Sequence, residues 1–160
     1  MSDRRARSAT AALLACALAS AISLAGCRPD RGGRVTKGTI AISHAVAPAP
    51  ASPSEATAFF TIDNRGPTAD TLLSARSPDA DMAMLHSVTA GRMETVEWLA
   101  VPPGERVTLA PGGYHLMLHG LRHAVAAGDT LTLRLRFSGA GELVVRVPVL
   151  RYSEAVEELK

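Results

Sequence analysis

Residues 130–137, TLTLRLRF, decide the fold class of this chain. Apolar and polar side chains alternate strictly along the stretch, so that one side holds Leu131, Leu133, Leu135 and Phe137. Successive side chains of a β-strand point to opposite faces, whereas a helix repeats every 3.6 residues. The alternation therefore predicts a strand with one face in a core and the other in water.

Similar short segments cover the chain from Thr39 to Leu150, and Gly, Pro, Asp or Ser bounds each of them. No apolar repeat of helical period persists before the C-terminal tail. About nine short strands with hairpin-length gaps predict an all-β fold, an antiparallel Greek-key β-sandwich or barrel in a single domain over residues 38–150. In the first strand we expect Ile40, Ile42 and His44 on one side. Residues 151–160 are expected to be a C-terminal tail that forms one helical turn or frays.

The N-terminus has the layout of an export signal, predicted over residues 1–26. A basic start precedes an apolar run, and Leu24-Ala25-Gly26-Cys27 resembles a bacterial lipobox. This predicts cleavage before Cys27, acylation of that cysteine, and a flexible tether over residues 27–37. An ordinary secretory signal or an uncleaved membrane helix is the alternative. Arg28, in place of an aspartate, favours the outer membrane over the inner one.

Charge and cysteine usage narrow the functional classes. The predicted signal holds three of the 17 basic and one of the 15 acidic residues, so 14 of each remain and the mature chain is formally neutral. We find no basic patch that would indicate a nucleic-acid partner. The two cysteines are Cys16 and Cys27, so the domain itself has no thiol and no disulfide.

Methionine and histidine gather in one part of the chain. Apart from Met1, every methionine lies between residues 82 and 117, and three of the five histidines lie in or beside that window. Side chains at i, i+2 and i+4 of a strand share a face, so two mixed rows are expected. One row holds Met82, Met84 and His86, and the other holds His115, Met117 and His119.

The chemistry of these rows favours one kind of ion. Thioether is a soft, neutral ligand and imidazole is intermediate, so the pair suits Cu(I) better than zinc, calcium or magnesium. We expect Tyr114, Leu116 and Leu118 to face the core, which turns His115 and Met117 outward, where a methionine has little packing role. A blue-copper centre needs a cysteine ligand and is excluded.

These residues resemble the PCuAC family, small exported cupredoxin-like copper chaperones. Met93 and His115 enclose 21 residues, His115-x-Met117 follows, and PGGYH (111–115) and GDTLTLRLRF (128–137) match further family blocks. The resemblance covers roughly residues 38–150. It implies a cupredoxin-like fold and a Cu(I) site with four ligands: His86, Met93, His115 and Met117.

One spacing departs from the family. His86 and Met93 enclose six residues rather than about ten, which leaves open whether both reach the site. Gly91 favours a tight turn that would keep the two strands opposed. We expect three further side chains as auxiliary metal ligands beside these four: His119, Met82 and Met84. We expect His44 and His123 to be ordinary surface histidines.

The function predicted is a lipid-anchored carrier in the periplasm or cell envelope that binds Cu(I) and passes it to another exported protein. The resemblance implies that the recipient is the copper centre of cytochrome c oxidase or another copper chaperone. No Ser-His-Asp pattern or H-E-x-x-H motif is visible, so we do not expect an enzyme. The alternative is a metal-free, immunoglobulin-like adhesion or scaffold lipoprotein, for which the fold alone would suffice.

Overall fold

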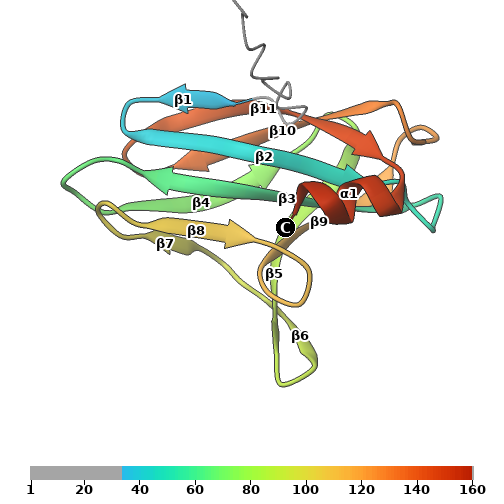
Figure 1. The fold of residues 1–160 in the computed structure, drawn as a ribbon, viewed down its shortest axis with the longest axis horizontal. Coiled ribbons are helices and arrows are strands. Elements are labelled where there is room, and N and C mark those ends of the chain that lie inside the picture. The colour runs from blue at the N-terminus through green and yellow to red at the C-terminus, as the bar shows by residue number, and fades with distance from the viewer. Residues whose placement is uncertain (1–33, 160) are drawn as a thin grey trace, which may run out of the picture.

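The computed structural model describes residues 34–159, and most of that region is built of strands (Figure 1). The predicted signal, Cys27 and the first part of the tether lie outside the described residues. Within residues 34–159 no helix is long and apolar enough to cross a membrane. The elements are β1 Val35–Lys37, β2 Ile40–Pro48, β3 Glu55–Asn64, β4 Asp70–Arg76, β5 Ala80–Thr89, β6 Arg92–Thr95, β7 Leu99–Val101, β8 Arg106–Leu109, β9 His115–Leu121, β10 Thr130–Phe137, β11 Gly141–Leu150 and α1 Tyr152–Glu158.

The strands form one hydrogen-bonded path in the order β6-β5-β9-β3-β2-β11-β10-β4-β7, with β1 beside β2 and β8 beside β3. The predicted all-β, cupredoxin-like class is confirmed. One pairing departs from the expected antiparallel pattern, because β2 and β11 run parallel where Val149 lies opposite Ala47. β11 runs antiparallel to β10, its hairpin partner, and parallel to β2 on its other side.

The core lies on the inner faces of these strands. Leu131, Leu133 and Leu135 are fully buried and Phe137 nearly so, as the alternation in residues 130–137 predicts. Burial of each such side chain contributes about 1.5 to 3 kcal/mol. Leu116 and Leu118 of β9 pack in the same core. This packing fixes the inner face of β9.

The first long strand differs from the expectation at one residue. Ile40 and Ile42 are buried, but His44 is exposed with a φ of 52°, and the β2–β3 register shifts between Ser43 and Val46. A bulge inserts an extra residue and turns its side chain away from the row it would otherwise join. His44 therefore does not share the side of Ile40 and Ile42.

Both ends of the domain extend beyond the predicted boundaries. Val35–Lys37, expected as tether, form β1, which pairs with residues 40–42 through a turn in which Gly38 has a positive φ. At the C-terminus, α1 lies against β2 (Figure 1). Its buried Ala155 packs against Val46 and Phe59. The tail is a docked helix because burial of this small apolar cluster stabilises more than a single free helical turn could.

Candidate metal centre

The pairing of β5 with β9 brings the two methionine and histidine rows side by side. Directly opposite side chains on one face of an antiparallel pair have Cβ atoms about 4.5 to 5.5 Å apart. The opposite pairs are Met82 with His119, Met84 with Met117, and His86 with His115. The two rows predicted from the sequence therefore form one continuous patch.

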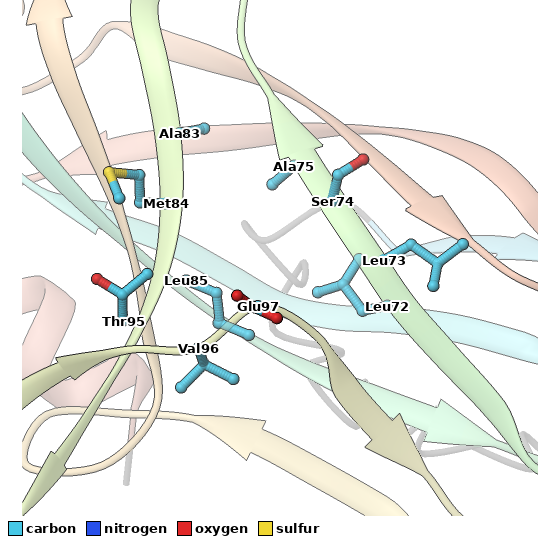
Figure 2. A pocket seen from close by; sticks show the side chains of 10 residues that line it. All are labelled: Leu72, Leu73, Ser74, Ala75, Ala83, Met84, Leu85, Thr95, Val96 and Glu97. Atoms are coloured by element: carbon cyan, nitrogen blue, oxygen red, sulfur yellow. The ribbon is translucent and has the colours of Figure 1, made fainter.

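This patch lies on the face of the sheet opposite the core. The side chain of Met84 leaves β5 on one side, whereas those of Ala83 and Leu85 leave it on the other (Figure 2). All three residues line the groove between β5 and β4. On β9, Met117 is half-buried while its neighbours Leu116 and Leu118 are fully buried in the core. Met117 lines a separate depression beneath residues 48–52, which accounts for its partial burial.

Tyr114 does not join Leu116 and Leu118 on the inner face. It precedes β9, which begins at His115, and its side chain is exposed. Gly112 has a φ of 80° in the turn before it. The period-two alternation starts only where the strand starts, so the expectation for Tyr114 was wrong.

Hydrogen bonds hold two of the imidazole rings in defined tautomers. His115 Nδ1 donates to the Gly113 carbonyl at 3.1 Å, and His119 Nδ1 donates to the Glu55 carboxylate at 3.1 Å. Both acceptors lack a proton, so each neutral ring carries its hydrogen on Nδ1 and keeps a lone pair on Nε2. Histidines that bind metals are usually oriented in this way.

His86 is the most constrained histidine of the patch. Its ring is buried, and the ring centroid lies 5.7 Å from that of His115 and 6.1 Å from that of His119. Burial lowers its pKa, and coulombic repulsion from His115 and His119 lowers it further, so the His86 ring is neutral at neutral pH. In the described part of the chain, His86 Nε2 is the one buried side-chain nitrogen or oxygen with no hydrogen-bond partner.

The short spacing between His86 and Met93 still brings the two side chains together. His86 Nδ1 lies 3.0 Å from Met93 Sδ. Nitrogen and sulfur bound to one first-row metal, at about 2.0 and 2.3 Å, are about 3.0 to 3.5 Å apart for angles near 90° to 110°. The distance suits a hydrogen bond from Nδ1 to the thioether, which leaves the lone pair on Nε2, or, with the hydrogen on Nε2, coordination of one ion by Nδ1 and Sδ.

A tight hairpin explains this contact. Thr89 pairs with Arg92, and the two residues between them, Ala90 and Gly91, have φ values of 51° and 75°. Positive φ at both central residues is the signature of a type I′ turn, which matches the twist of paired strands. Met93 then lies opposite Val88, one step along the same face from His86.

Ala90→Gly is expected to stabilise this turn. An L-residue with a side chain loses about 1 kcal/mol or more in the left-handed region, while glycine enters it freely. We expect the urea midpoint of the apo protein to rise by the equivalent of about 0.5 to 1 kcal/mol. Gly91→Ala makes the reverse change at the other central residue of the turn. It should lower the urea midpoint because alanine is disfavoured at positive φ, although its Cβ would meet no neighbour within 4 Å. A midpoint that falls for Ala90→Gly would contradict the turn geometry.

The other histidines and acidic residues make no competing centre. Within residues 34–159 no group of three or more His, Cys, Asp or Glu side chains is arranged to hold a metal ion. His123 hydrogen-bonds Asp79 and the Ala124 carbonyl, away from the patch. Glu55, which orients His119, was missed from the sequence because it lies 64 residues away on β3 and no local pattern signals it.

Comparison with known proteins places the chain in a family. Residues 40–149, more than half of the chain, match the family model described as "Putative lipoprotein LpqE-like". The chain belongs to the LpqE-like family. An LpqE-like relative, "Putative lipoprotein Lxx21020" of Leifsonia xyli subsp. xyli (strain CTCB07), is 36% identical over 108 residues, which are 64% of this chain and 65% of the relative. The chain thus spans just under two thirds of that relative's length.

Solved structures similar to this LpqE-like chain are PCuAC domains, which confirms the resemblance found in the sequence. The "Copper-bound PCuAC domain from PmoF2" has a TM-score of 0.66 and 27% identity, over 74% of this chain and 98% of that one. The apo PCuAC domain from PmoF1 has a TM-score of 0.66 and 26% identity, over 74% and 99%. The solution structure of CuI-DR1885 from Deinococcus radiodurans has a TM-score of 0.59 and 26% identity, over 82% and 87%.

Proposed function

We propose that this LpqE-like protein binds Cu(I) through four side chains and passes the ion to another exported protein. The ligands are His86, Met93, His115 and Met117. One observation carries the proposal: the buried, neutral imidazole of His86 has an unpartnered Nε2, its ring faces that of His115, and its Nδ1 lies 3.0 Å from the Met93 thioether. An orphaned buried nitrogen costs about 1 to 3 kcal/mol, and a soft cation would satisfy it.

The same geometry suits delivery of the ion. The ligands are neutral, and thioethers are weak donors that a partner's ligands can displace one at a time. The side chain of Met93 is 55% exposed at the β5–β6 hairpin, so the exchange can begin there while the buried histidines still hold the ion. Thioethers also survive in an oxidising compartment, where paired thiolates would be lost to disulfides.

Membership of a lipoprotein family supports a cell-envelope location. We propose that Cys27 carries the lipid and residues 28–34 tether the domain to the periplasmic side of the outer membrane. The recipient is then the copper centre of cytochrome c oxidase or another copper chaperone, as the PCuAC likeness suggests. The protein acts as a carrier rather than an enzyme. A metal-free adhesion module would leave the unpartnered nitrogen of His86 without a role.

Met117→Leu tests the ligand set. We expect Cu(I) affinity, measured anaerobically by competition with a chromogenic chelator, to fall about tenfold or more, since one soft donor is lost while the side-chain volume is kept. We also expect Cu(I) to raise the melting temperature of the wild type more than that of the variant.

Leu118→Met is the matched control on the same strand. It adds a thioether to the core face, where Leu118 is fully buried, and should leave Cu(I) affinity unchanged. If Met117→Leu binds Cu(I) as tightly as the wild type, Met117 is not a ligand. If the wild type itself shows no saturable binding, the proposed function is wrong.

A further inference from the structure

We propose that the patch carries a second Cu(I) site, formed by Met82, Met84 and His119. This inference goes beyond the proposed function, which concerns a single ion at the His86 end of the patch. The ligands of the second site are distinct from the four assigned above, so either site can exist without the other.

The register of β5 and β9 brings the three side chains to one spot. Met82 lies directly opposite His119, and Met84 is the next residue on the same face of β5. Opposite Cβ atoms are about 5 Å apart, and neighbours on the same face about 6.6 Å apart. Methionine has three rotatable side-chain bonds. Two flexible thioethers can therefore reach an ion bound at the imidazole of His119.

His119 is prepared as a ligand by a residue from a third strand. Glu55 of β3 pairs with His119, and its carboxylate accepts the Nδ1 hydrogen at 3.1 Å. This leaves the Nε2 lone pair for a metal and fixes the plane of the ring. The Glu55 carboxylate also supplies a negative charge that offsets a second cation on the same face.

Packing in the hydrophobic core does not explain why residues 82 and 84 are methionines. Met82 is 57% exposed, Met84 is half-buried, and neither belongs to the hydrophobic core. Both line a surface depression with Arg76 and Arg122, and His119 is not among its lining residues. The charge of Arg122 is countered by Asp81, which accepts from its Nε at 3.1 Å. Soft donors therefore line an open depression that a partner or a free ion can reach.

The two sites are neighbours on the patch. Met82 and His86 are four residues apart on β5, which corresponds to about 13 Å along the strand, but the ring centroid of His119 lies 6.1 Å from that of His86. Two monovalent ions bound on this patch therefore repel each other, which weakens the binding of the second ion. We expect the second ion to bind about tenfold or more weakly than the first, because its site is more exposed and has fewer donors.

Methionine methyl NMR of the full chain in detergent tests the proposal, with Cys16→Ser and Cys27→Ser so that no thiol competes for the metal. Under anaerobic titration with Cu(I), the first equivalent should shift the methyl signals of Met93 and Met117. The second equivalent should shift those of Met82 and Met84. The double variant Met82→Leu/His119→Gln should bind one ion fewer. Before Cu(I) is added, its remaining methyl signals should match those of the wild-type apo protein.

The reciprocal double variant His86→Gln/His115→Gln separates this inference from the proposed function. It should lose the tight ion and still shift the methyl signals of Met82 and Met84. If those two signals do not move with Cu(I) in excess, or move together with Met93 and Met117 in the first equivalent, there is no second site. If they move while Met93 and Met117 do not, the proposed function fails and the second site stands.

Discussion

Replacement of His86 by leucine is expected to weaken Cu(I) binding about a hundredfold or more and to stabilise the apo protein by about 1 kcal/mol. The loss follows from removal of the buried imidazole that contacts Met93 and faces His115. The gain follows because the unpartnered Nε2 disappears from the interior, where an unsatisfied polar atom costs about 1 to 3 kcal/mol. Chelator competition measures the first effect, and urea unfolding of the apo protein measures the second.

The same substitution should change the pH dependence of stability. The pKa of His86 is lowered by burial and then by His115 and His119, so the unfolded chain takes up a proton at this residue at a higher pH than the folded chain does. The apo protein therefore loses stability as the pH falls from about 6.5 toward the lowered pKa. His86→Leu should remove that part of the loss.

His123→Leu is the matched control, because His123 is an exposed histidine outside the patch. It should alter neither the Cu(I) affinity nor the pH dependence attributed to His86. A His86→Leu protein that keeps wild-type Cu(I) affinity would remove His86 from the site. A lower free energy of unfolding in apo His86→Leu would mean that Nε2 has a partner in solution.

Asp70→Ala is expected to lower the free energy of unfolding by about 4 kcal/mol, since one buried carboxylate joins the start of β4 to the β10–β11 turn. Its oxygens accept hydrogen bonds of 2.7 to 2.8 Å from the Thr71, Gly139 and Ala140 amides and the Ser138 hydroxyl. Truncation leaves these donors without the carboxylate, and each buried donor so orphaned costs about 1 to 3 kcal/mol. Urea unfolding measures the change.

The pKa of Asp70 gives this prediction a pH test. Burial raises the pKa, but the hydrogen bonds from Gly139, Ser138, Ala140 and Thr71 outweigh burial and lower it below 3.8. The stabilisation is therefore complete above about pH 4 and is lost as the pH falls through the lowered pKa. The difference in stability between wild type and Asp70→Ala should become smaller there.

Asp81→Ala is the control for Asp70. Asp81 pairs with Arg122 on the surface, where both side chains are more than half exposed, so its loss should cost less than about 1 kcal/mol. An Asp70→Ala protein no less stable than Asp81→Ala would show that the carboxylate does not hold the turn.

The strand pattern and the composition of the candidate site were predictable because both depend on local alternation. The buried leucines of residues 130–137 lie inside as their spacing predicts, and the two methionine and histidine rows lie on one face each. The expectation failed for His44, where a bulge interrupts the alternation, and for Tyr114, which precedes the strand. Residues 35–37, expected as tether, pair with β2 instead. The tail forms a helix, one of its two expected outcomes, and contacts with β2 and β3 hold that helix in place.

By itself the sequence determined an all-β domain with two mixed rows of soft ligands and no thiol in the domain, because side-chain period and residue chemistry are properties of short segments. Only the tertiary structure decided that the two rows are adjacent, that Met93 reaches His86 across a shortened hairpin, and that Glu55 orients His119. Those relations depend on strand register, turn geometry and burial. Register and burial are set by residues far apart in the chain that meet only when the sheet forms, whereas the β5–β6 turn is local and was indicated by Gly91.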